Sequence, residues 1–294
     1  MNSNGMQELY DLAQANADTY WHAVDLPYRF ASWALDDERN GRLWRNADGS
    51  LAAGAIRQGA WTELDAVLPP ATWANGIADA VIAWGCEREQ ALANEMARSL
   101  TLYMMARTDD EQRHERLRAH GFSPIEWALH HMTQSLDRSI PQFAPPTGFA
   151  IRPLQATEVG AYVALHRTAF GSTNMTDEWR SRTRQMPQYI NDLDLVAVAP
   201  DGQLAAFCIG WLNTARTVVQ IEPCGVHPEF GRLGLGRAIV HACLGQMQAH
   251  GAATAVVHCE TDNPPAFALY TGAGFRSAFT FSAWAKTFHP QQKA

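Results

Sequence analysis

A six-residue pattern occurs twice in this chain, and its spacing constrains the fold more than any other feature. Residues 48–53 and residues 201–206 both read DGxLAA, and they stand 153 positions apart. The same offset relates residues 120–122 (HGF) to residues 273–275 (AGF). Self-similarity at a long fixed period is the sign of a duplicated structural unit. The two halves of the chain are therefore predicted to be copies of one fold.

The length and one proline-rich segment locate the boundary between the copies. A chain of 294 residues suits two domains of roughly 100–200 residues each. Residues 139–148 (SIPQFAPPTG) contain three prolines and end in glycine, a composition typical of linkers. We expect a first domain over residues 1–140, a linker over residues 139–148 and a second domain over residues 148–294.

Each copy of the pattern predicts an antiparallel hairpin, because Asp-Gly between apolar runs favours a tight turn. In the second half we expect a strand over residues 218–226, then a glycine-rich turn, then a helix that ends at His250 before Gly251. The order closes with a strand over residues 255–260, a short helix from Pro264 to Gly272 or Gly274, and a strand near residues 279–286. Each half is thus predicted to be α/β (α+β).

Composition excludes several classes of protein. The 23 Lys and Arg residues against 30 Asp and Glu residues give a net charge of −7, which opposes broad binding to nucleic acid or to an anionic membrane. Neither a membrane-spanning apolar run nor a signal-peptide pattern at residues 1–14 is present, so a cytoplasmic protein is expected. The five cysteines are odd in number and lack CxxC spacing, and the histidines lack metal-ligand spacing. We expect reduced thiols and no metal.

Residues 231–237 (GRLGLGR) form a glycine-rich turn between a predicted strand and a predicted helix. Glycines let the backbone approach an anion, and the N–H groups and dipole of the helix N-terminus attract it. A dinucleotide-binding GxGxxG would need glycine at Ile239, and a P-loop would need Lys-Ser/Thr after Gly236. The turn predicts a phosphate site of another kind, and a turn that serves only helix packing is the alternative.

A second motif connects this turn to a known family. Residues 263–275 (NPPAFALYTGAGF) resemble the N-x-x-A-x-x-x-Y-x-x-x-G-F signature of the GCN5-related N-acetyltransferase (GNAT) superfamily. Residues 226–236 resemble the acetyl-CoA loop of that family, although Gly231 stands where Arg or Gln is usual and the arginine is displaced to Arg232. The resemblance covers most of residues 148–288. The duplication is similar to tandem-GNAT proteins of the mycothiol synthase kind.

The resemblance implies two tandem GNAT-like domains, each a mixed, mostly antiparallel sheet flanked by helices. Two parallel strands would splay apart around the pantetheine arm of acetyl-CoA, which is the implied co-substrate. Asn263 has helix capping as an alternative role. The residues expected to contact acetyl-CoA are Cys224, Val226, Gly231, Arg232, Leu233, Gly234, Leu235, Gly236, Arg237 and Asn263.

Tyr270 matches the position of the general acid of the family, which protonates the departing thiolate. A core aromatic beside Phe267 is its alternative role. The resemblance further implies that the Val226 N–H faces the thioester oxygen.

An attacking ammonium must lose its proton, and Glu222 is the only carboxylate in residues 218–226. We therefore expect Glu222 to be the base, with a solvent contact at the strand edge or a role for water as the alternatives. Strand alternation places Gln220, Glu222, Cys224 and Val226 on one face, unless a bulge intervenes.

The first half lacks the catalytic features. At the offset of 153, Asp110 stands for Asn263 and Leu117 stands for Tyr270. Trp73 follows residues 67–69, which roughly match residues 226–228, and no GxG pair occurs there. We expect a degenerate, non-catalytic copy and one CoA site per chain, with a retained but inactive CoA site as the alternative.

The sequence therefore predicts an acetyl-CoA-dependent N-acetyltransferase that modifies a primary amine of a small molecule through direct attack. A non-catalytic protein that senses acyl-CoA or a small molecule is the alternative, and a purely structural module is a third. Neither nucleic acid nor membrane is an expected partner. The acceptor amine and the oligomeric state stay open.

Overall fold

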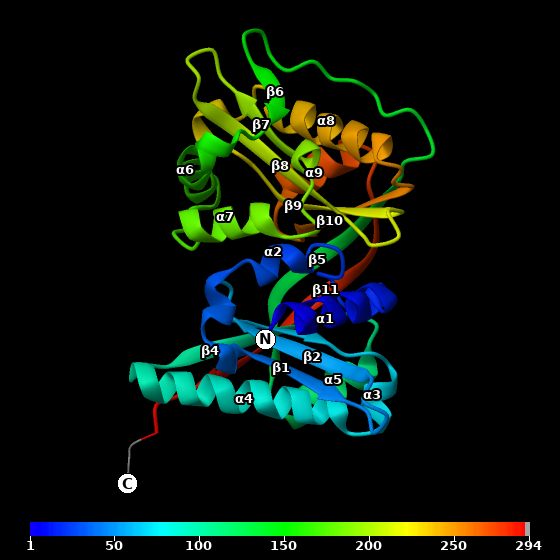
Figure 1. Ribbon diagram of the computed structural model, residues 1–294, viewed down its shortest axis with the longest axis vertical. Coiled ribbons are helices and arrows are strands. Elements are labelled where there is room, and N and C mark those ends of the chain that lie inside the picture. Colours follow the sequence, from blue (N-terminus) through cyan, green and yellow to red (C-terminus); the bar gives the residue numbers. More distant parts are fainter. Residues whose placement is uncertain (292–294) are drawn as a thin grey trace. The chain divides into compact units, whose positions relative to one another are not determined.

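The computed structural model describes residues 1–291, so the last three residues of the predicted second domain lie outside it. The chain forms two compact units, which Figure 1 shows as a ribbon. Unit 1 comprises Met1–Leu26, Ser32–His130 and the described residues from Phe279 onward. Unit 2 comprises Pro27–Ala31 and His131–Ala278.

Unit 1 combines a mixed sheet with helices on both of its faces. Its helices are α1 (Ser3–Ala15), α3 (Ala71–Ala74), α4 (Ile77–Met96) and α5 (Glu111–Ala119), with single 3-10 turns at Ala17–Thr19, Trp33–Asp36 and Glu38–Asn40. Its strands are β1 (Gly41–Arg45), β2 (Leu51–Gln58), β3 (Glu63–Val67), β4 (Leu100–Arg107), most of β5 (Ser123–Ser135) and most of β11 (Arg276–Phe288).

The first DGxLAA pattern forms the predicted hairpin. Strands β1 and β2 pair antiparallel, with Gly41 opposite Ile56, and Gly49 in the turn has a φ of 86°. On β2, Ala53 and Ala55 belong to a core cluster with residues of α4, whereas a Cβ at Gly54 would meet Leu9 of α1. Strand alternation thus turns successive residues toward helices on opposite faces.

Unit 2 has the helix and strand order predicted for the second half. After α2 (Leu26–Phe30), it contains β6 (Ala150–Pro153), a 3-10 turn (Ala156–Glu158), α6 (Val159–Phe170), α7 (Asp177–Gln185), a 3-10 turn (Asn191–Leu193), β7 (Asp194–Val198), β8 (Leu204–Leu212), β9 (Val218–Val226), a 3-10 turn (Pro228–Phe230), α8 (Leu235–Ala249), β10 (Thr254–Glu260) and α9 (Pro264–Gly272). The predicted hairpin is β7 and β8, which pair antiparallel. The α/β class is confirmed.

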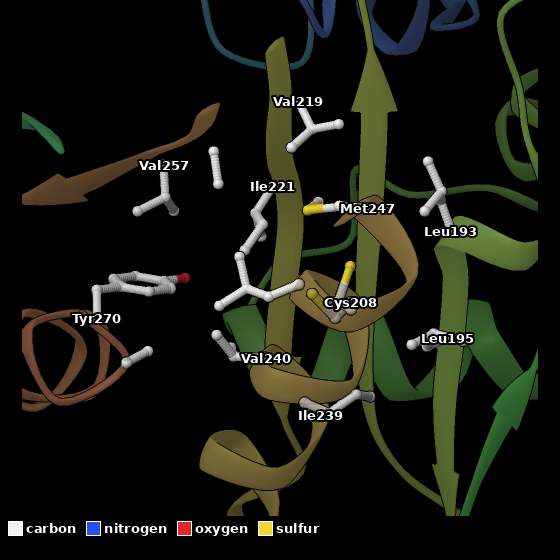
Figure 2. Packing of buried hydrophobic residues seen from close by; sticks show 14 of the residues in the cluster. Leu193, Leu195, Cys208, Val219, Ile221, Ile239, Val240, Met247, Val257 and Tyr270 are labelled. Carbon is white, nitrogen blue, oxygen red and sulfur yellow. The ribbon is translucent and has the colours of Figure 1, made fainter. Parts of the chain in front are cut away.

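The sheet of unit 2 lies between two helix layers. Gly210 of β8 faces α8, because a Cβ there would meet Met247 and Cys243. Gly225 of β9 faces α6, because a Cβ there would meet Phe207 and Ala169. The side chains between the sheet and α8 form the main core cluster of the unit, shown in part in Figure 2.

The two units exchange strands. In unit 1, β4 pairs antiparallel with β11, from Phe281 opposite Arg107 to Phe288 opposite Leu100. In unit 2, β5 is the hydrogen-bonded neighbour of β10. Each unit therefore includes strand residues from the other half of the sequence. This is why the compact units differ from the predicted division at residues 139–148, a segment that contains no helix or strand.

Candidate active site

Strands β9 and β10 form a fork. They are parallel, and their register runs from Val218 opposite Thr254 to Ile221 opposite Val257. Both strands continue, β9 to Val226 and β10 to Glu260, but their pairing ends at Ile221. Past that point the two strands no longer pair with each other.

A bulge in β9 lies at the start of the fork. Cys208 of β8 pairs with Cys224, whereas Gly210 pairs with Ile221, so Glu222 and Pro223 together oppose one residue. Ile221 and Cys224 both pack into the core cluster under α8. The predicted common face of Gln220, Glu222, Cys224 and Val226 is therefore broken by the bulge, because an extra residue reverses the alternation.

The glycine-rich turn leads into α8 with its N-terminus open. Gly234 is the N-cap, with a φ of 87°, and no side chain caps the helix. Arg232 has a φ of 62°, so the turn contains two left-handed residues. Successive residues of opposite hand form a concave nest of N–H groups that attracts anions. The backbone geometry predicted for a phosphate site is therefore present.

A cavity of about 630 Å³ joins the turn to the fork. Its wall includes nine of the ten residues predicted to contact acetyl-CoA. The exception is Leu233, whose side chain is half exposed and does not line the cavity. The nine are Cys224, Val226, Gly231, Arg232, Gly234, Leu235, Gly236, Arg237 and Asn263.

Several wall residues were not found from the sequence. Ala169 and Phe170 come from the end of α6, which is more than 50 residues before the fork in the chain. Phe230, Pro265, Ala266 and Leu269 complete the apolar wall. Pro265, Ala266 and Leu269 could have been predicted, because they belong to the motif at residues 263–275. No local pattern marks Ala169 or Phe170.

Glycine at position 236 keeps the cavity open. A Cβ there would lie 3.4 Å from Leu269 Cδ2 and 3.5 Å from Val226 Cγ2. Both distances are ordinary contacts, so alanine would fit while a larger side chain would fill the space between α8 and α9. Arg237 also lines the cavity, and its guanidinium stacks 3.6 Å above the ring of Phe143. The residues present thus fit a narrow ligand arm with an anionic end.

Tyr270 closes the inner end of the cavity. Its side chain is buried, and its ring packs edge-on against Phe275 at 5.8 Å. In Figure 2 its hydroxyl points into the core cluster. Burial raises the pKa of the Tyr270 hydroxyl well above its usual value, and nearby Cys224 adds to the rise. The phenol therefore keeps its proton at neutral pH, as a proton donor must.

Glu222 lies within electrostatic reach of this tyrosine. Burial raises the pKa of both Tyr162 and Tyr270, and the negative charge of Glu222 raises each further. The Glu222 carbonyl accepts a hydrogen bond of 2.7 Å from Trp211 Nε1, which holds the bulge in place. Glu222 itself is half buried and does not line the cavity.

The caps of α5 and α9 show the duplication at atomic detail. The Asn263 side chain accepts from Ala266 N at 3.1 Å, and the Asp110 side chain accepts from Arg113 N at 3.0 Å. Asn263 thus has the capping role and also lines the cavity. Leu117, at the place of Tyr270, is fully buried.

The turn before α4 in the first copy has the same left-handed N-cap glycine as the turn before α8, but bulky side chains lie near it. Gly76 is the N-cap of α4 with a φ of 77°, the counterpart of Gly234 before α8. Trp73 and Leu117 belong to one core cluster, and Trp73 lies 6.0 Å from the Arg113 guanidinium. Burial lowers the pKa of Arg113. Trp73 and Leu117 are therefore buried in the core of unit 1.

Unit 1 also brings together three buried groups that the sequence spacing did not reveal. His22, Glu63 and Asp65 place one ligand atom each within 4.8 Å of one another. His22 Nδ1 lies 2.8 Å from Asp25, and Trp21 Nε1 donates to Glu63 at 3.1 Å. The histidine stands about 40 positions before the two acids, so only the fold reveals the cluster.

Residues 162–275 match the model of the acetyltransferase (GNAT) family. This segment is therefore similar to GNAT domains. The mycothiol acetyltransferase of Clavibacter michiganensis subsp. michiganensis is 34% identical over 137 residues, which are 45% of this chain and 44% of that protein. The chain spans about half the length of the curated relatives it matches. The predicted resemblance is confirmed.

Solved structures extend the likeness to the whole chain. A tandem GNAT protein from the clavulanic acid biosynthesis pathway has a TM-score of 0.68 at 17% identity, over 99% of this chain and 97% of that one. A GCN5-related N-acetyltransferase from Sphaerobacter thermophilus has a TM-score of 0.68 at 21% identity, over 87% and 83%. The tandem-GNAT fold is therefore confirmed. Within residues 1–291, no helix has the length and apolarity needed to cross a membrane.

Proposed function

We propose that the protein is an acetyl-CoA-dependent N-acetyltransferase, and that its GNAT domain transfers the acetyl group to a primary amine of a small molecule. The observation that carries the proposal is the cavity that reaches from the nest at Gly234 to Tyr270 and is lined by the end of β9, where β9 no longer pairs with β10. This cavity combines a site for an anion, an apolar channel and a proton donor in that order. A structural module needs none of these.

We assign roles in this reaction to residues of the turn, of β9 and of α9. The nest and Arg232 would hold the phosphates, and the backbone of β9 past Ile221, where its pairing with β10 ends, would hold the amide-bearing arm. Acetyl-CoA supplies a thioester that is reactive toward amines. Glu222 would accept the proton of the amine, directly or through water, and Tyr270 would give its proton to the departing sulfur. The Val226 N–H would donate to the thioester oxygen.

The relatives support a small-molecule acceptor. Several of the curated relatives are named mycothiol acetyltransferases. Since these matches cover only about half of those proteins, the particular amine does not follow from them. We therefore propose the class, a primary amine, and leave its identity to experiment.

The test is to incubate the protein with acetyl-CoA and a panel of amines while following the release of free thiol. We expect thiol release that depends on one class of amine. CoA binding without release on any amine would replace this proposal with the sensing function. Absence of CoA binding by calorimetry would leave only a structural role.

A further inference from the structure

Cys224 is the only cysteine in the wall of the acetyl-CoA cavity. The five cysteines all lie in the described part of the chain, and the other four are Cys86, Cys208, Cys243 and Cys259. On β9 the wall runs from Cys224 through Val226 to the turn that begins at Gly231. Cys224 therefore lies at the end farthest along the strand from the phosphate nest, beside Tyr270. That is the end where the proposed function places the sulfur of CoA.

Cys208 lies directly across the sheet from Cys224. The two residues are partners in the antiparallel register of β8 and β9. Opposite residues in such a pair have Cα atoms about 4.5–5.5 Å apart, which falls within the roughly 4.4–6.8 Å range found for disulfides. Cys224 and Cys243 are also the two neighbours that most raise the pKa of the Cys208 thiol. Cys208 is fully buried, whereas Cys224 is partly exposed.

We propose that Cys224 is a site of reversible modification by CoA disulfide, with Cys208 as the thiol that resolves the adduct. The proposal rests on the proposed function only in that CoA must enter this cavity. The cavity would deliver a disulfide of the ligand it already recognises to the one thiol in its wall. Modification then depends on CoA recognition rather than on general exposure of a thiol.

The chemistry is an exchange that balances without an additional oxidant. The Cys224 thiolate attacks one sulfur of CoA disulfide, a Cys224–CoA disulfide forms, and one CoA leaves as a thiolate that takes up the proton lost by Cys224. The Cys208 thiolate then attacks Cys224 Sγ, the Cys208–Cys224 disulfide forms, and the second CoA leaves in the same way. The protein loses two electrons, and one CoA disulfide is reduced to two CoA thiols.

The two steps should differ in rate. Hydrogen bonds from Cys224 and Cys243, together with burial, raise the pKa of the Cys208 thiol well above its usual value. Little Cys208 thiolate exists at neutral pH, so the adduct should accumulate first and resolve faster as the pH rises. The adduct fills the cavity, so acetyl-CoA cannot bind until Cys208 displaces the bound CoA.

The test uses the reduced full-length protein, CoA disulfide as the probe, and two readouts, intact mass and equivalents of CoA thiol released. We expect one CoA adduct mapped to Cys224, followed by release of two thiol equivalents per chain. Cys208→Ser should keep the adduct and release one equivalent. Cys224→Ser should form no adduct and release none. Cys86→Ser, a change outside this cavity, should behave as the wild type.

Three outcomes decide the matter. An adduct on a cysteine other than Cys224 would overturn the proposal. So would labelling by a small disulfide that matches the labelling by CoA disulfide and is not slowed by excess CoA. Reversible CoA binding by calorimetry with no adduct would also overturn it while the proposed function stands. If Cys224→Ser no longer binds CoA, the absence of an adduct in that variant is not used as evidence. The proposal is then tested by two results: the cysteine that carries the adduct in the wild type, and the single equivalent of CoA thiol released by Cys208→Ser.

Discussion

At the scale of single residues, Tyr270 and Leu117 form a natural comparison. They occupy the same place in the two copies, both are buried, and only the tyrosine has a proton to give. Burial keeps the pKa of Tyr270 well above its usual value, so the phenol is protonated throughout the neutral range. The chemistry of the site is therefore expected in unit 2 alone.

Replacing Tyr270 by phenylalanine removes that proton and keeps the aromatic ring. We expect kcat to fall by about 10²–10⁴-fold, with little change in CoA affinity and in thermal stability. Steady-state kinetics and calorimetry measure the two parts. The matched variant Leu117→Met conserves volume in the first copy and should leave kcat unchanged. Full activity of Tyr270→Phe would show that another group protonates the thiolate.

Glu222 is tested by its dependence on pH. Glu222→Gln removes a proton acceptor while keeping the shape of the side chain, so turnover should fall near neutral pH without loss of CoA affinity. Raising the pH should restore part of the rate, because the amine then loses its proton to solvent. The measurement is kcat/KM against pH for both proteins. An equal loss at every pH would identify a role in binding or structure instead.

His166 makes a separate contribution to stability. It stacks on Phe207 at 5.6 Å, and burial, with the charge of Arg180 second, lowers its pKa to about 4. The unfolded chain has a histidine pKa of about 6.5 and therefore binds more protons between these values. Stability is complete above pH 6.5 and falls as the pH drops toward 4, by about 3 kcal/mol at most.

The prediction for His166 is a difference between two unfolding curves. His166→Phe cannot gain a proton, so its free energy of unfolding should change less than that of the wild type between pH 7 and pH 4.5. Denaturant unfolding at a series of pH values measures this. Parallel pH profiles for the two proteins would show that His166 is not the titrating group.

At the scale of elements, the local patterns in the sequence predicted what local physics determines. The Asp-Gly turns identified both hairpins, and the strand Val218–Val226 and the helix ending before Gly251 were found in place. The bulge at Glu222 was left open because alternation alone cannot show an inserted residue. The partners of β5 and β11 were missed because a strand pattern does not state which strand lies beside it.

The N-cap of α9 allows its two roles to be separated. Asn263→Ser keeps a hydroxyl that can accept from the Ala266 N–H, whereas Asn263→Ala removes the cap at a cost of about 1 kcal/mol. We expect both variants to weaken CoA binding if the carboxamide contacts the ligand, and only the alanine to lower the melting temperature. Asp110→Ala, the same change on α5, should lower stability with no effect on CoA binding.

At the scale of the whole molecule, each half of the sequence supplies a strand to the unit formed mainly by the other half. Residues Phe281–Phe288 complete the sheet of unit 1, and the end of β5 lies beside β10 in unit 2. Neither half of the sequence therefore contains all the strands of one unit. Loss of the first copy would remove β5, which is one neighbour of β10. Because β10 is one of the two strands of the fork, the first copy contributes to the architecture of the site although none of its residues line the cavity.

The number of CoA molecules bound per chain tests whether unit 2 alone binds CoA. Unit 2 has an open cavity at Gly236, whereas Trp73 and Leu117 are buried in the core of unit 1. We expect calorimetry to give one site per chain. Gly236→Val should abolish or strongly weaken it, because branched carbons would extend beyond the 3.4 Å approach to Leu269 into the path of the ligand.

The control for this last experiment is Gly236→Ala, whose single added carbon makes only ordinary contacts. It should fold as the wild type and bind CoA with an intermediate loss of affinity, so that affinity follows the volume added at one position. Two equivalent sites in the wild type would mean that unit 1 also opens for CoA. Unchanged binding by a folded Gly236→Val would mean that the ligand does not pass between α8 and α9.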